Sequence, residues 1–294
     1  MSELRGPPDE RSMDELLSFG VVNLDKPPGP SAHQVSAWAR DEAGVDRAAH
    51  AGTLDPKVTG CLPILLGDAT RLAQVFLEGT KEYVAVLELH GPVPADLDAV
   101  LAEFEGEIYQ KPPRKSAVSR RLRTRTIHEL DLLEVRDRQA LIRIRCESGT
   151  YVRKLCHDLG LAAGTGAHMG DLRRTATDPF DDSDLVSTAD LTDALVFARE
   201  GDESALREVV SPAERSLTHL PKLTIAHSAA EQVAEGAPVY APGIVDVDDA
   251  TLAADTGALV TCFTPDDAAV CLGQLVGEAT AESGEVVSLE RVLV

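Results

Sequence analysis

The stretch AHAGTLDPKVTGCLPILLGDATRL, residues 49–72, joins a loop rich in glycine and proline to an apolar run. Its glycines and prolines interrupt any long regular element, so we expect a loop that leads into a buried strand at about 61–66. Asp55 lies in this loop, and the proline after it favours an extended or turn conformation. A carboxylate placed there is either a turn former or a nucleophile or general base on a rigid loop. The local sequence leaves both interpretations open.

Hydrophobic periodicity on either side of this stretch predicts a mixture of strands and helices. The apolar and alternating patterns predict strands within 20–30, 81–91, 126–135, 139–147 and 168–180. Helical spacing predicts helices at 33–43, 69–79, 95–105, 149–164, 188–199 and 203–210. From about Leu220 the chain is rich in Val, Ala, Thr, Gly and Asp in short strand-like runs, which indicates a separate β-rich unit.

The 294 residues exceed the usual size of one compact domain, and 44% of them are hydrophobic, which is enough for a core and excludes wholesale disorder. We therefore expect a loose N-terminal arm at 1–17, a main domain at 18–215 and a small domain at 220–294. The pattern predicts an α/β (α+β) fold.

The net charge is −21, with 28 Lys and Arg against 49 Asp and Glu, and only 7 of the 28 are Lys. A chain this acidic and this poor in Lys is typical of proteins that work in concentrated salt, where charge repulsion is screened over about 3 Å. The alternative is an ordinary acidic protein. We favour the halophilic interpretation.

One region reverses this charge. Residues 110–174 carry 15 Lys and Arg against 7 Asp and Glu, whereas residues 178–294 carry 5 against 23. Such a basic run in an acidic chain indicates binding of a polyanion such as RNA, and the alternative is pairing of its arginines with the acidic remainder. The candidate contacts to the RNA backbone are Arg114, Lys115, Arg120, Arg121, Arg123 and Arg125.

Several classes of protein are disfavoured. No apolar stretch is long enough to cross a bilayer, and the first 17 residues lack the apolar core of a signal peptide. The five cysteines show no CxxC and no paired spacing, which argues against a zinc site or a disulfide framework. We expect a cytoplasmic protein with no membrane partner, no metal and no cofactor.

The 49–72 stretch resembles the catalytic segment of the TruB/dyskerin family of RNA pseudouridine synthases, G-H-x-G-T-L-D-P-x-x-x-G. GVVNLDKPPGPSAHQV resembles the Lys-Pro motif of that family, KEYVAVLELHG its Tyr motif, GTYVRKLCHDLG its Arg motif and GAHMGDLRRTATDPF the segment after that. The tail is similar to a PUA domain, most clearly in GAPVYAPGI at 236–244. The resemblance implies a mixed, mostly antiparallel sheet with flanking helices, followed by a small PUA domain.

The resemblance also implies roles for single residues. Asp55 takes the position of the nucleophile, Arg153 that of the arginine that pairs with it, and Tyr83 that of the tyrosine that stacks on the flipped base. His50 matches a histidine that helps to hold the flipped nucleotide, and Leu172 an apolar residue against the base. A sixth residue, Lys26 of the Lys-Pro motif, is expected near the substrate, with a mainly structural role.

The segment KPPRKSAVSRRLRTRTIHELDLLEV lacks the thumb-like insertion of the bacterial enzymes, which indicates the archaeal and eukaryotic branch. Membership of that branch implies work on rRNA in an H/ACA particle, with guide RNA and small particle proteins as partners. It also implies uridine-55 of the tRNA T-loop as a second possible substrate. The alternatives are a catalytically silent RNA-binding scaffold and a nucleoside-processing hydrolase. Intact Asp55, Tyr83 and Arg153 disfavour the scaffold, while the basic run and PUA-like tail disfavour the hydrolase.

Overall fold

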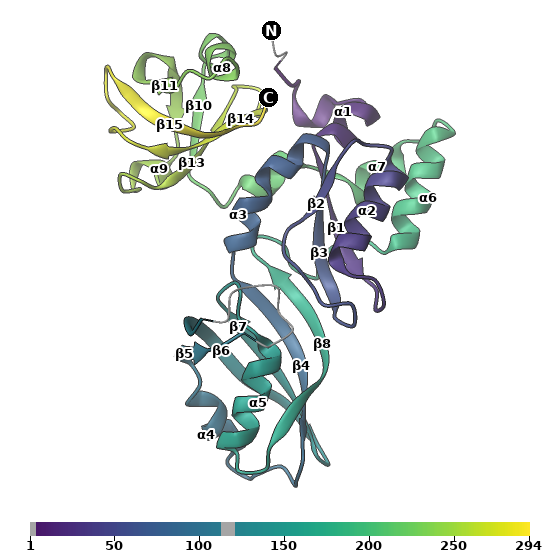
Figure 1. The fold of residues 1–294 in the computed structure, drawn as a ribbon. Helices are drawn as coiled ribbons and strands as arrows, with labels where there is room; N and C mark the ends of the chain where they lie inside the picture. Colours follow the sequence, from purple (N-terminus) through teal and green to yellow (C-terminus); the bar gives the residue numbers. More distant parts are fainter. Residues whose placement is uncertain (1–3, 113–120) are drawn as a thin grey trace.

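The computed structural model describes residues 4–112 and 121–294 and has a mixed α/β fold with two mostly antiparallel sheets (Figure 1). The larger sheet runs through the main body of the molecule and carries helices along it. The smaller sheet forms a separate body at the C-terminal end of the chain (Figure 1). This architecture confirms the expected fold class.

In the part of the chain that the structure describes, nine strands form the larger sheet, in the order β5-β6-β7-β4-β8-β3-β1-β9 with β2 beside β3. Their bounds are β1 Gly20–Lys26, β2 Ala48–His50, β3 Thr59–Leu66, β4 Lys81–Leu89, β5 Gly106–Gln110, β6 Arg123–Arg136, β7 Gln139–Cys146, β8 Ala167–Thr177 and β9 Ser211–Pro212. The smaller sheet has the order β11-β15-β14-β13-β10-β12. Its strands are β10 Lys222–Ile225, β11 Val239–Tyr240, β12 Ile244–Val247, β13 Leu259–Phe263, β14 Ala269–Leu275 and β15 Glu285–Val292.

The helices lie where apolar residues recur at helical spacing, and three of them begin at a serine whose side chain completes a capping box. The α-helices are α1 Met13–Ser18, α2 Ala32–Ala43, α3 Ala73–Glu78, α4 Leu97–Ala102, α5 Val152–Ala162, α6 Thr188–Arg199, α7 Ser204–Val209, α8 His227–Ala234 and α9 Asp249–Leu252. Short 3-10 turns are η1 Pro8–Glu10, η2 Gly67–Leu72, η3 Ala213–Leu217 and η4 Ala241–Gly243. Among the described residues, no helix has both the length and the apolar character needed to cross a membrane.

The larger sheet has two separate apolar cores. One lies between β1, β3 and the helices α1, α2, α6 and α7, and the other between β4, β6, β7, β8 and the helices α4 and α5. The two halves of the sheet join where β3 runs parallel to β8, through the pairs Thr59–Arg173 and Gly60–Arg174 (Figure 1). The backbone of β8 comes so close at Gly60 that a Cβ there would lie 2.1 Å from the Arg174 carbonyl oxygen. The loop that contains Asp55 leads directly into this junction.

The N-terminal segment differs from the loose arm that the sequence predicts. Its described residues form η1 and α1, and Leu16 and Leu17 are buried. Arg11 is 2% exposed and donates two hydrogen bonds to the Glu214 carboxylate, at 3.0 and 2.6 Å. The expectation fails because a long-range ion pair fixes this segment, and short-range composition carries no signal for such a pair.

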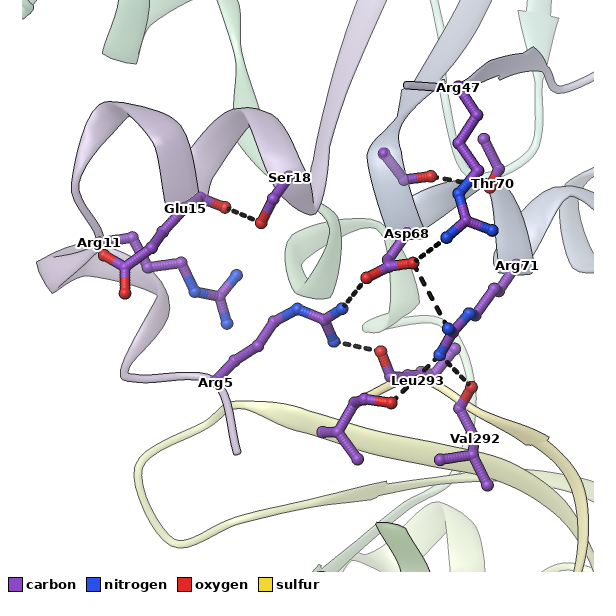
Figure 2. Close-up of polar contacts among 12 residues, drawn as sticks. Arg5, Arg11, Glu15, Ser18, Arg47, Asp68, Thr70, Arg71, Val292 and Leu293 are labelled. Atoms are coloured by element: carbon purple, nitrogen blue, oxygen red, sulfur yellow. Dashed lines mark hydrogen bonds and ion pairs between the residues drawn. The ribbon is translucent and has the colours of Figure 1, made fainter. Parts of the chain in front are cut away.

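The smaller sheet is fastened to the main body by apolar and polar contacts. One buried cluster combines side chains of η2 and α3 with Phe263 and Leu272 of the smaller sheet. Figure 2 shows the polar contacts: Arg5 donates to the Asp68 carboxylate at 2.9 Å and to the carbonyl of Leu293, and the Arg71 guanidinium donates to backbone carbonyls that include that of Val292. The N-terminal segment, η2 and the end of the chain therefore meet in one place.

Candidate active site

The loop between β2 and β3 is held from below by Lys26. Its side chain is fully buried, and the ammonium donates hydrogen bonds to the carbonyls of Pro27 (2.9 Å), Pro56 (3.0 Å) and Val58 (2.8 Å). All three donors of the ammonium are thus used on backbone carbonyls. Two of these carbonyls belong to Pro56 and Val58, which follow Asp55 in the loop. The ammonium therefore has no donor left for a substrate, and Lys26 positions the loop, in line with the mainly structural role expected of it.

Asp55 and Arg153 form an ion pair across the junction between the two halves of the sheet. Asp55 comes from the loop before β3, and Arg153 is the second residue of α5, 98 positions later in the chain. Both side chains are more than half exposed, at 55% and 57%. The pair expected from the sequence is formed, and its carboxylate faces solvent.

Tyr83 and Leu172 lie on the same face of the sheet, on the neighbouring strands β4 and β8. Strands β4 and β8 run antiparallel, with Tyr83 opposite Arg174 and Ala85 opposite Leu172. Both side chains are partly buried and pack against both apolar cores, which places them at the boundary between the cores. Burial raises the pKa of the Tyr83 phenol, while the positive charge of Arg174 acts in the opposite direction. Tyr83 therefore stays protonated at neutral pH.

Two buried cations that the sequence analysis missed lie beneath the loop. Arg174 is 1% exposed and donates to the carbonyls of Cys61 (2.7 Å) and Gly52 (3.3 Å). Lys81 is 5% exposed and donates to the carbonyls of Phe76 and Gly79, at 2.8 and 2.7 Å. The available signal for Arg174 was its place two residues after Leu172, on the same face of the same strand.

Gly52 has a left-handed conformation with φ +135°, which favours glycine. A Cβ there would lie 3.0 Å from the Arg174 guanidinium and 3.7 Å from the Lys81 side chain. The protein's own cations thus approach the backbone closely at Gly52.

His50 ends β2 at the entrance to the loop. Its Nδ1 accepts a hydrogen bond from the backbone N–H of Gly52 at 3.4 Å, which leaves Nε2 to carry the ring proton in the neutral form. Burial lowers the pKa of His50, and the charges of Arg174 and His33 lower it further. At neutral pH the ring is therefore a neutral hydrogen-bond donor through Nε2.

The basic run is only partly described. Arg114, Lys115 and Arg120 lie outside the described residues, while Arg121 is exposed and Arg123 begins β6. Arg125 donates to the Glu147 carboxylate at 3.2 Å and is 20% exposed, and its contact with RNA stays a prediction.

Other arginines of the basic region are paired as well, as the alternative interpretation expected. Arg143 pairs with Asp131 at 2.9 Å, and Arg145 with Asp178 at 3.3 Å. Within residues 4–112 and 121–294, no group of three or more His, Cys, Asp or Glu side chains is arranged to hold a metal ion.

Four family models match successive parts of the chain. The model of the TruB family pseudouridylate synthase N-terminal domain matches residues 40–96 and 92–152, and that of the tRNA pseudouridylate synthase B C-terminal domain matches 153–218. The DKCLD (NUC011) domain matches 6–36, and the PUA domain matches 221–293.

Curated relatives match over nearly the whole length. A probable tRNA pseudouridine synthase B of Haloarcula marismortui is 67% identical over 99% of this chain and 94% of its own length. A protein of the same description from Methanopyrus kandleri is 47% identical over 98% of this chain and 86% of its own length.

Two solved structures have the same fold. The structure of a Cbf5–Nop10–Gar1 complex superposes with a TM-score of 0.91 and 42% identity, covering 100% of this chain and 91% of the other. The structure of an H/ACA RNP bound to a substrate RNA containing 2'-deoxyuridine gives a TM-score of 0.90 and 40% identity, with coverage of 100% and 91%.

Proposed function

The chain belongs to the TruB family of pseudouridine synthases and isomerises uridine to pseudouridine, and we propose that it does so through Asp55 as the nucleophile. The observation that carries this proposal is the ion pair between Asp55 and Arg153. The guanidinium places a positive charge beside the carboxylate and fixes its orientation, as a carboxylate nucleophile needs.

The bonds that break and form follow from the structures of the substrate, uridine, and of the product, pseudouridine. Asp55 forms a bond to the target nucleoside, and the bond between C1' and N1 breaks. The base turns and a bond forms between C1' and C5. The bond to Asp55 then breaks, C5 gives its proton to solvent, and N1 gains a proton. Uridine and pseudouridine are isomers, so the overall reaction needs no oxidant, reductant or co-substrate.

The surrounding side chains support the turned base. Tyr83 and Leu172 offer an adjacent aromatic and aliphatic surface on β4 and β8, on which a flipped pyrimidine stacks. His50 donates from Nε2 to the flipped nucleotide. Because the ring is neutral, this contact orients the nucleotide without placing a second cation beside the carboxylate.

Structured RNA is the proposed substrate, and the PUA domain is the proposed second contact to it. A relative is described as bound to substrate RNA in an H/ACA particle, and others as tRNA pseudouridine synthases. We propose that this chain works best when H/ACA guide RNA and small particle proteins position the uridine in rRNA, and more weakly on the tRNA T-loop. The PUA domain and the segment that leads into it lie within residues 178–294, which are strongly acidic. Binding of bare RNA therefore requires salt that screens the electrostatic repulsion between this region and the RNA. A cytoplasmic location follows as part of the same proposal.

Pseudouridine mapping tests this substrate assignment. A tRNA transcript and an rRNA fragment are each incubated with the chain in molar KCl, with and without matching guide RNA and particle proteins. We expect weak modification of the transcript alone and much faster modification of the guided site, because positioning lowers the barrier by several kcal/mol. Rapid modification of the T-loop by the chain alone, with no gain from guide RNA, would replace the guided enzyme by a stand-alone tRNA enzyme.

A further inference from the structure

Arg174 is a buried charge without an ionic partner. Only 1% of its surface is exposed, and no described carboxylate lies within ion-pair distance of it. Its neighbour in sequence, Arg173, is different: it pairs with Asp25 at 2.9 Å and is 39% exposed. Burying a guanidinium without an ionic partner costs free energy. The presence of Arg174 here therefore calls for a role that a neutral side chain does not fill.

The hydrogen bonds of Arg174 connect the two ends of the loop that contains Asp55. Nε donates to the carbonyl of Cys61 at the start of β3, and Nη2 donates to the carbonyl of Gly52 at the start of the loop. The guanidinium makes these contacts from two different nitrogens at a fixed separation, a geometry that the single nitrogen of an ammonium does not reproduce. The loop is thereby held from the β8 side, while Lys26 holds it from the β1 side.

Arg174 also faces the other side chains of the site. Tyr83 lies directly opposite Arg174 on β4. The positive charge of Arg174 acts to lower the pKa of Tyr83, His50 and Lys81. The further charged or titratable groups that face these three side chains are His33, Asp178, Cys61 and Cys146. Arg174 is the group that these three environments share.

We propose that Arg174 is a positioning residue of the active site, a buried guanidinium that fixes the Asp55 loop through Gly52 and Cys61 and sets the electrostatic environment of Tyr83 and His50. This inference rests on the proposed function of Asp55, Tyr83 and His50. Arg174 contacts neither the Asp55 carboxylate nor the base. It acts through hydrogen bonds to the loop backbone and through the electrostatic effect of its charge on neighbouring side chains.

The test compares Arg174→Lys and Arg174→Met with the wild-type chain in molar KCl. Three quantities are measured: turnover of the guided uridine at saturating RNA, the dissociation constant for that RNA, and the pKa of His50 by NMR titration. Arg174→Lys keeps the charge and loses the double contact, so turnover falls about tenfold or more while RNA affinity stays within about threefold. In Arg174→Met the pKa of His50 rises, because a positive charge beside it is lost, whereas in Arg174→Lys it stays near the wild-type value.

Arg11→Met is the matched control, since it also removes a fully buried guanidinium, but from the N-terminal segment. It lowers stability and leaves turnover per folded molecule and the pKa of His50 unchanged. Asp55→Asn is run in parallel: turnover retained by Asp55→Asn overturns the nucleophile assignment, while the titration of His50 still reports on Arg174.

The proposal is overturned if Arg174→Lys turns over within about twofold of the wild type. It is also overturned if the loss of turnover is matched by an equal loss of RNA affinity, or if the pKa of His50 does not move in Arg174→Met. Failure of both variants to fold where Arg11→Met folds would make Arg174 a residue of the fold alone, which also contradicts the proposal.

Discussion

At the scale of single residues, the loop around Asp55 is rigid because buried cations bind its backbone. Lys26 and Arg174 donate hydrogen bonds to carbonyl oxygens of the loop and of the residues beside it. Lys81 donates to carbonyl oxygens of residues just before β4. Each cation donates to at least two backbone carbonyls. The cations also place positive charge beneath a site that handles a polyanion.

Arg153→Lys tests whether the geometry of the ion pair matters in addition to its charge. The lysine keeps a positive charge but loses the planar fork that orients a carboxylate, so turnover is expected to fall about tenfold or more while RNA affinity is little changed. Single-turnover kinetics at saturating RNA measure the chemical step. A lysine variant as fast as the wild type would reduce the role of Arg153 to that of a nearby charge.

Lys81 gives a prediction for the pH dependence of stability. Burial lowers its pKa from 10.5 to about 8, with the charge of Arg174 adding to the effect. Below pH 8 both the folded and the unfolded chain hold the proton, and the folded state bears the full cost of the buried charge. Between about pH 8 and 10.5 the unfolded chain binds more protons than the folded protein, so the contribution of Lys81 to stability rises with pH.

Lys81→Met removes this rise. The free energy of unfolding of the wild type minus that of the variant is expected to grow by about 3 kcal/mol from pH 8 to 10.5, as measured by urea unfolding in constant salt. The two carbonyls left unpaired in the variant add a difference that does not depend on pH. A difference that stays flat across this range would show that the ammonium is not desolvated.

The sequence predicted the reacting residues better than the residues that support them. Asp55, Arg153, Tyr83 and Leu172 were placed by motifs. The structure pairs Asp55 with Arg153 and packs Tyr83 and Leu172 against both cores. Their catalytic roles stay predictions. Lys26 was expected near substrate because a motif gives a position along the chain and not a degree of burial, and Arg174 was missed for the same reason.

At the scale of elements, periodicity predicted most strands and helices, including α6 at 188–199 and the neighbouring strands β6 and β7. The short strand β2 was missed, since three residues carry no periodic signal. The expected helix at 69–79 is in fact η2 followed by α3. Register across β4 and β8, with its bulges, depends on pairing between distant segments, and local patterns do not report it.

The buried pair Arg11–Glu214 gives a prediction about the N-terminal segment. Arg11→Met leaves the buried Glu214 charge without the guanidinium that pairs with it, so the free energy of unfolding falls by about 3–5 kcal/mol, whereas Arg11→Met with Glu214→Met recovers part of the loss. Arg215→Met is the control, because its pair with Asp9 joins the same elements but is exposed, and its loss costs about 1 kcal/mol or less. Equal, small losses for Arg11→Met and Arg215→Met would show that the segment is loosely held after all.

At the scale of the whole molecule, the larger sheet supplies the active site and the PUA domain is fixed beside it by the apolar cluster around η2 and α3 and the contacts of Arg5 and Arg71 (Figure 2). The net charge of −21 falls mostly on the C-terminal part, so both folding and RNA binding are expected to depend on screening by salt. Composition was sufficient to predict this dependence, because net charge needs no structure. The placement of the PUA domain was not predictable, because it rests on contacts between segments more than 200 residues apart.

The central claim is that Asp55 attacks the uridine, and release of tritium from C5-labelled uridine in RNA tests it most directly. Wild type and Asp55→Asn are compared in molar KCl with the guided substrate, and RNA affinity is measured for both. The amide keeps the shape of the side chain and removes its nucleophilicity, so tritium release should fall to below about a hundredth of wild type. RNA affinity should stay within about tenfold, or roughly 1.4 kcal/mol. Release by Asp55→Asn above that hundredth, with RNA affinity intact, would contradict the account.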